Sequence, residues 1–148
     1  MVSLSTANTD QAAKLLREET AQYTLLLDIL KTEQQALAQG AIEDISRISE
    51  EKAQCVADIN KLENQRQSLS DNQNSKQHPA LAELWRNLSN LAQQARELNL
   101  ANGRMINTRL QRTQDALSIL RTDNERDPTY GPDGQANTPG NGRPLASA

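Results

Sequence analysis

The sequence has no phenylalanine, one tryptophan and two tyrosines, so aromatic residues make up 2% of its 148 residues. β-Sheets depend on aromatic and β-branched side chains to cover their faces. Valine occurs twice, and leucine, isoleucine, valine and methionine together reach about a fifth of the chain, near the lower limit for a folded protein. These shortages exclude a β-sandwich, a β-barrel and a thick globular core. They predict one thin domain of long amphipathic helices.

Cysteine and histidine occur once each, as Cys55 and His78. One cysteine excludes a disulfide within the chain, and the two residues together are too few for a cysteine- or histidine-based metal site. We interpret His78, which stands next to Pro79, as a loop or capping residue rather than a member of a Ser-His-Asp triad. The sequence therefore predicts a protein that is not an enzyme and holds no metal or cofactor.

Long apolar runs are missing as well. No stretch approaches the roughly 18 residues of a transmembrane helix, and residues 1–10 lack the basic and apolar regions of a secretion signal. The net charge is −3, and the arginine-rich segment 79–122 lacks the aromatic residues on which nucleic-acid bases would stack. We therefore expect a soluble, intracellular chain with solvent-exposed arginines that neither inserts into a membrane nor binds nucleic acid.

Three segments place apolar residues three and four positions apart, which is the spacing of amphipathic helices. They lie near residues 9–39, 43–70 and 79–122, with Gly40 ending the first and Pro79 beginning the third. The expected fold is all-α, an elongated antiparallel three-helix bundle or coiled coil with a long third helix.

The chain is expected to divide into a helical domain, residues 1–122, and a tail, residues 123–148. The tail holds four of the six glycines and four of the five prolines. Such a composition buries too little apolar surface to order itself. We therefore predict an irregular, flexible tail.

The segment 43–70 has the most regular pattern, a coiled-coil seam that alternates by three and four over four heptads. Cys55 falls on this seam, where we interpret it as a small apolar filler. Lys52 and Arg66 fall on it too, and we expect their long aliphatic stems to carry the charges out of a thin bundle into solvent. Glu19, in the first segment, is interpreted as solvent-facing charge.

Asn102 and Gly103 interrupt the apolar pattern of the third segment. An Asn-Gly pair is a turn signal, so this segment is either one long helix or two helices hinged at that point. We favour one helix, because the apolar stripe resumes without a polar gap. Asn102 lies on the seam, where a hydrogen-bonded asparagine fixes the register of a bundle; a ligand site is the alternative.

A continuous third helix would span about 63 Å, against roughly 42 Å for each of the others, so its end should overhang the bundle. Exposed apolar stripes usually mark interaction surfaces, and a second amphipathic helix is the simplest partner. Homodimerisation through the same stripe is the alternative. The predicted binding residues are Met105, Ile106, Leu110, Leu117, Ile119 and Leu120.

Four motifs stand out when the sequence is read as a whole: LLREETAQYTLLLDILKTEQQAL, SEEK at residues 49–52, ELNLANGRMIN, and TYGPDGQ in the tail. Together they resemble the FlgN family, the type III export chaperones of bacterial flagellar assembly, over about residues 15–135. The helical motifs are of low specificity, because many coiled coils look alike. The asparagine-rich segment and the Tyr-Gly-Pro-Asp-Gly run are much sharper.

The resemblance implies a cytoplasmic chaperone that binds the hook-filament junction proteins FlgK and FlgL by their C-terminal helices. It would prevent their premature assembly and deliver them to the export gate, without catalysis. It also implies that a tail tyrosine docks on the gate protein FlhA, and Tyr130 is the candidate in this tail. The alternatives are that Tyr130 packs back on the bundle, and that the whole chain is a homo-oligomeric coiled-coil scaffold.

Overall fold

The computed structural model describes residues 6–69, 76–126, 129–130 and 136–137. Its helices are α1 (Thr6–Gln39), α2 (Ile42–Gln67), a short 3-10 helix η1 (Pro79–Leu81) and α4 (Ala82–Arg126). Two strands of two residues each, β1 (Thr129–Tyr130) and β2 (Ala136–Asn137), follow. The chain divides into two compact units, Met1–Met105 and Ile106–Ala148. The prediction of an all-α bundle with a long third helix is confirmed.

The helix boundaries follow from local sequence. Gly40 adopts a positive φ of 73°, which a glycine accepts without steric cost. The amide of Ala41 then donates to the carbonyl of Ala36, and the amide of Gly40 donates to the carbonyl of Leu37. These hydrogen bonds satisfy carbonyl groups at the C-terminus of α1 and end the helix. At the start of η1, Nδ1 of His78 accepts from the amide of Ala80 at 3.2 Å. His78 is therefore a capping residue, as predicted.

α4 is continuous through Asn102 and Gly103. Gly103 has helical geometry, and a Cβ built on it would meet no atom within 4 Å. The prediction of one long helix is confirmed, and the hinged alternative is wrong. The Asn-Gly turn signal is overridden because the helical apolar pattern continues on both sides of it.

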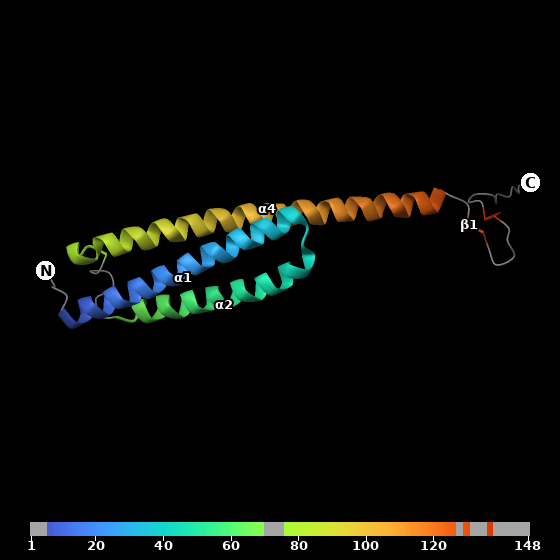
Figure 1. Ribbon diagram of the computed structural model, residues 1–148. Coiled ribbons are helices and arrows are strands. Elements are labelled where there is room, and N and C mark those ends of the chain that lie inside the picture. The colour runs from blue at the N-terminus through green and yellow to red at the C-terminus, as the bar shows by residue number, and fades with distance from the viewer. Residues whose placement is uncertain (1–5, 70–75, 127–128, 131–135, 138–148) are drawn as a thin grey trace, which may run out of the picture. The chain divides into compact units, whose positions relative to one another are not determined.

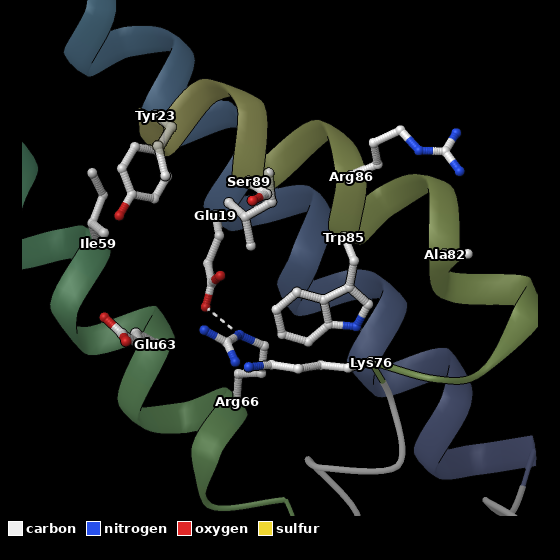
Figure 2. A pocket seen from close by; sticks show the side chains of 12 residues that line it. Glu19, Tyr23, Ile59, Glu63, Arg66, Lys76, Ala82, Trp85, Arg86 and Ser89 are labelled. Carbon is white, nitrogen blue, oxygen red and sulfur yellow. Dashed lines mark hydrogen bonds and ion pairs between the residues drawn. The ribbon is translucent and has the colours of Figure 1, made fainter. Parts of the chain in front are cut away.

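In the unit Met1–Met105, α1 lies between α2, which runs antiparallel to it, and the first part of α4 (Figure 1). One core cluster forms where the start of α1 meets η1 and α4, and Trp85 packs against it (Figure 2). Its buried members are Ala12, Ala13, Leu16, Leu81 and Leu88. At this end of the bundle α1 thus buries apolar residues against η1 and α4.

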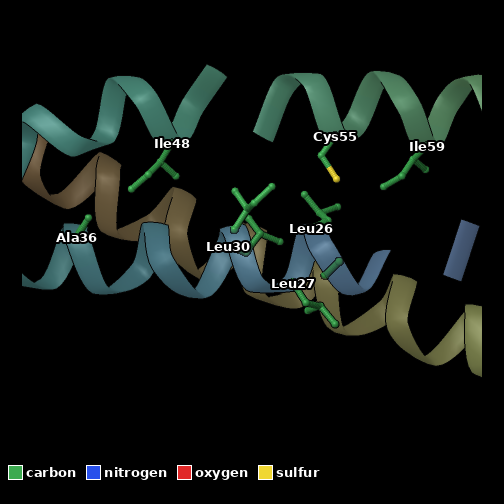
Figure 3. Close-up of a cluster of buried hydrophobic side chains, with 9 residues drawn as sticks. Leu26, Leu27, Leu30, Ala36, Ile48, Cys55 and Ile59 are labelled. Carbon is green, nitrogen blue, oxygen red and sulfur yellow. The ribbon is translucent and has the colours of Figure 1, made fainter. Parts of the chain in front are cut away.

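The second cluster lies further along α1 and includes Cys55 of α2 and Ala95 of α4 (Figure 3). Cys55 is 3% exposed, and burial raises the pKa of its thiol. It serves as a small apolar filler, which confirms the sequence interpretation. The remaining members are Leu26, Leu27, Ile29, Leu30, Ala36, Ile48 and Ile59.

Candidate protein-binding surfaces

The part of α4 that belongs to the unit Ile106–Ala148 exposes five large apolar side chains. Their exposed fractions run from 39% to 61%, and such clusters mark interaction sites on protein surfaces. They are Ile106, Leu110, Leu117, Ile119 and Leu120. All five belong to the predicted cargo-binding set; the sixth member, Met105, is half-buried and belongs to the other unit.

Helix geometry brings four of these residues together. Intervals of four, seven and three residues place them within about 80° of the helix circumference. We call this set the apolar stripe: Ile106, Leu110, Leu117 and Leu120. Ile119 follows Leu117 by two residues and therefore points about 200° away, on the opposite face. Met105 lies about 100° from Ile106 around the helix.

The tail residue Tyr130 lies in β1, which pairs antiparallel with β2. Tyr130 is opposite Ala136, and Thr129 is opposite Asn137. The tail therefore contains a short backbone pairing that its glycine and proline content did not indicate. The Tyr130 side chain lies outside the described part of the chain.

Two ion pairs join α1 to α2 in the unit Met1–Met105, one of them fully buried and the other with its lysine half-buried. Nε of Arg66 donates to Oε1 of Glu19 at 2.9 Å, and Nζ of Lys52 donates to Oε2 of Glu33 at 2.8 Å. Glu19 and Glu33 are each 1% exposed, and Arg66 is 7% exposed. The expectation that Arg66 reaches solvent, and that Glu19 faces it, is wrong. Lys52 stays 25% exposed but directs its ammonium group to the buried Glu33. The charged groups of Lys52 and Arg66 turn toward α1 because the carboxylates of Glu33 and Glu19 lie buried on it.

The Glu19–Arg66 pair is part of a larger polar cluster (Figure 2). The Arg66 guanidinium lies 4.6 Å from the centre of the Trp85 ring, and Nζ of Lys76 lies 5.4 Å from it, so both make cation–π contacts. Burial raises the pKa of Glu19, and the hydrogen bond and charge of Arg66 oppose that shift. Desolvation also raises the pKa of Tyr23, one turn along α1.

The second pair includes a residue of α4. Nδ2 of Asn102 donates to the carbonyl of Leu30 and to Oε1 of Glu33, both at 2.9 Å, and Asn102 is fully buried. Glu33 thus accepts from Lys52 on α2 and from Asn102 on α4, which ties three helices together. This geometry supports the structural interpretation of Asn102 over a ligand site.

The sequence carries a signal for these pairs in the spacing of their residues. Glu33 follows Glu19 by fourteen residues, and Arg66 follows Lys52 by the same fourteen. Fourteen residues are two heptads, so each helix presents two like charges on one face. Two antiparallel helices with such faces match both pairs in a single register. The spacing shows that the pairs Glu19–Arg66 and Glu33–Lys52 fit one register, whereas the packing of the helices decides whether the side chains turn inward.

Other classes of site find no support in the described residues. Among them, no group of three or more histidine, cysteine, aspartate or glutamate side chains is placed to hold a metal ion. No helix of the described ranges has the length and apolar character needed to cross a membrane.

Comparison with known proteins identifies the family. The model of the FlgN protein family matches residues 1–138. The flagella synthesis protein FlgN of Salmonella typhimurium is 38% identical over 127 residues, which cover 81% of this chain and 89% of that protein. The namesake proteins of Yersinia enterocolitica and Escherichia coli are 34% and 30% identical, over 82% and 85% of this chain and 88% and 90% of their own lengths. No solved structure matches the chain. This chain belongs to the FlgN family.

Proposed function

We propose that this chain serves flagellar assembly as an export chaperone, which binds the C-terminal helices of the hook-filament junction proteins FlgK and FlgL. Membership of the FlgN family, and relatives named flagella synthesis proteins, support the role in assembly. The observation that supports binding of a helical cargo is the apolar stripe. Its four residues occupy one face of α4 and are exposed.

The physical basis of the proposed binding is burial of apolar surface. A helix with apolar residues at three- and four-residue intervals presents a complementary stripe to Ile106, Leu110, Leu117 and Leu120. These side chains are 39% to 59% exposed, so covering the rest of each one contributes only part of the roughly 1.5–3 kcal/mol that full burial gives. The same contact would cover the cargo's own assembly surface, so that cargo held by the chaperone does not polymerise before export.

Delivery is proposed to use a different part of the chain. Tyr130 would dock on the export-gate protein FlhA, since tyrosine offers a rigid apolar ring with a hydroxyl for a hydrogen bond. The backbone of Tyr130 pairs with that of Ala136. Separate sites for cargo and gate allow the loaded chaperone to bind both at once.

The proposal is tested by matched aspartate variants. Leu117→Asp puts a charge into the apolar stripe, whereas Ile119→Asp puts the same charge on the opposite face at a similarly exposed position. We expect Leu117→Asp, and more completely Ile106→Asp with Leu117→Asp, to abolish binding of a FlgK C-terminal helix measured by calorimetry. Ile119→Asp should bind nearly as the parent does. Equal binding by all variants, with helicity intact, would place the cargo site elsewhere.

The second candidate function, a homo-oligomeric coiled-coil scaffold, draws on the same observation. An exposed stripe on one helix can be buried against a second copy. Sedimentation equilibrium of the parent and of the Ile106→Asp, Leu117→Asp double variant separates the two functions. A stable oligomer that the double variant loses, together with no cargo binding by the parent, would favour the scaffold.

A further inference from the structure

A groove that the proposed function does not use runs between α2 and α4 in the unit Met1–Met105. Two hollows of about 480 and 640 Å³ make it up, and Tyr23 of α1 and Ala92 of α4 line both. α1 forms the floor with Glu19, Tyr23, Leu26 and Leu30. We call this feature the α2–α4 groove. In Figure 2, α2 and α4 face each other across it.

Each wall of the groove is a helical stripe. The α2 wall along the larger hollow consists of Ser49, Lys52, Ala53, Val56, Ala57 and Asn60. The α4 wall consists of Ala82, Trp85, Arg86, Leu88, Ser89, Ala92, Ala95, Arg96 and Asn99. From Ala82 to Asn99 an α-helix advances about 26 Å, which is about five turns. The groove therefore has the length of a medium-sized helix.

The lining favours a close apolar contact. Small side chains occur on both walls, so a helix backbone can approach there to the short interaxial distances of 8–10 Å found in bundles. They are Ser49, Ala53 and Ala57 on α2, and Ala82, Ser89, Ala92 and Ala95 on α4. Val56 is 40% exposed, and Tyr23 and Trp85 are half-buried, so apolar surface remains to be covered. Trp85 and Tyr23 are also the side chains best suited to anchor a partner in a desolvated pocket.

The charges at the groove select the partner. Arg86 and Arg96 form no ion pair among the residues that the structure describes, and Lys76 contacts the Trp85 ring. The lining has two acidic residues, Glu19 and Glu63. Glu19 is neutralised by its ion pair with Arg66, so Glu63, which accepts a hydrogen bond from Gln67, is the acidic residue without an ion pair among the described residues. The unpaired charge of the lining is therefore net positive, and it attracts acidic groups on an incoming partner.

We propose that the α2–α4 groove binds an amphipathic helix of a partner protein, whose apolar face enters the groove and whose flanks carry glutamate or aspartate. The acidic flanks meet Arg86 and Arg96, and the helix becomes the fourth member of a four-helix bundle. A second copy of this chain is a poorer occupant, because Arg109, Arg112 and Arg121 accompany its own apolar stripe. The groove is thus a second helix-binding site, distinct from the apolar stripe.

The full chain carries its own reporter for the test, because Trp85 is its single tryptophan and lines the groove. The probe is a tryptophan-free synthetic helix of about eighteen residues, or five turns, with leucine and alanine on one face and glutamate on both flanks. A matched peptide carries lysine in place of glutamate. We expect the glutamate peptide to change Trp85 emission saturably and the lysine peptide to bind at least tenfold more weakly.

Variants locate the contact. Ala57→Phe fills the groove from an exposed position of α2, and its control, Ala38→Phe, makes the same change at an exposed position of α1 that lines none of the hollows. Arg86→Glu with Arg96→Glu reverses the rim charge, with Lys31→Glu as the control. We expect at least tenfold weaker binding for the groove variants and unchanged binding for both controls.

Four outcomes would overturn the proposal. Equal binding of the lysine peptide would show that the positive charge of the lining does not select the partner. Full binding by Ala57→Phe would show that the peptide does not occupy the groove. Loss of peptide binding in the Ile106→Asp, Leu117→Asp double variant assigns the peptide to the apolar stripe instead. A dimer of the free chain that Ala57→Phe dissociates makes a second copy the occupant. The Ile106→Asp, Leu117→Asp double variant alters the apolar stripe and leaves the groove unchanged. Cargo binding and peptide binding are therefore tested separately, and failure of one proposal leaves the other intact.

Discussion

Arg66 on α2 donates its Nε hydrogen to Oε1 of Glu19 on α1 at 2.9 Å, in a place where neither side chain is appreciably exposed to solvent. Removing two charges from water is costly, and their attraction roughly offsets that cost when the geometry is good. The pair therefore stabilises one particular packing of the helices more than it stabilises folding as such. The Glu19–Arg66 and Glu33–Lys52 pairs both form when α1 and α2 pack in the same antiparallel register.

Breaking this pair from one side should be severe. Arg66→Met leaves the Glu19 carboxylate buried without its partner, and we expect it to lower the free energy of unfolding by about 3–5 kcal/mol. Glu19→Leu combined with Arg66→Met should restore stability to near that of the parent, since no buried charge remains. Urea denaturation followed by circular dichroism measures both. A double variant as unstable as the single one would show that the pair itself is indispensable.

The pH dependence of stability should carry the signature of Glu19. Burial raises the pKa of this carboxyl above its ordinary 4.5, so the folded chain keeps the proton to a higher pH than the unfolded chain does. Glu19 therefore contributes a loss of stability as the pH rises from about 4.5 through the raised pKa. The free energy of unfolding of the parent, minus that of Glu19→Gln, should decrease over this range. A difference that is flat in pH would contradict the raised pKa.

The two glycines in the described helical region should respond oppositely to alanine. Gly103→Ala should stabilise the chain by about 0.5–1 kcal/mol, because the glycine is inside a helix and an added Cβ meets nothing. Gly40→Ala should destabilise it by about 1 kcal/mol, because its φ is 73° and L-residues avoid that region. Thermal unfolding of both variants provides the comparison. A destabilising Gly103→Ala would mean that this position is strained.

Leucines that the helical pattern treats alike should differ in effect. Leu26 is 8% exposed and belongs to the core cluster, so Leu26→Ala should cost about 2–5 kcal/mol. Leu62 falls on the predicted seam of residues 43–70 yet is only half-buried, and Leu62→Ala should cost distinctly less. Chemical denaturation under identical conditions ranks the two. Equal losses would show that Leu62 is more fully covered in solution.

Tyr130→Ala should separate gate docking from cargo binding. We expect weaker binding to the cytoplasmic domain of FlhA, with cargo affinity and melting temperature nearly unchanged, since the residue lies outside the helical unit that forms the core. Thr129→Ala, at the neighbouring position of β1, is the matched control. Surface plasmon resonance with cargo-loaded chaperone measures the difference. Unaltered gate binding would leave Tyr130 as a packing residue of the tail.

The sequence by itself was sufficient for the helical architecture. Helix periodicity, Gly40 and Pro79 act within a few residues of where they stand, so the all-α fold and the junctions between helices follow from local chemistry. The exposure of the apolar stripe was also predictable, because a third helix much longer than its neighbours leaves apolar residues uncovered. The division of the predicted binding residues between two faces of the helix needed only the 3.6-residue period, which separates Ile119 from Leu117.

The tertiary structure decided where the polar seam residues point. A lysine or arginine at a core-facing position has the same local pattern whether it reaches solvent or meets a buried carboxylate, and the difference lies on another helix. Glu19, Glu33 and Asn102 therefore acquire their roles only when three helices meet. The α2–α4 groove is of the same kind, since it is formed by the spacing between two helices across a third, and no single segment of sequence encodes that spacing.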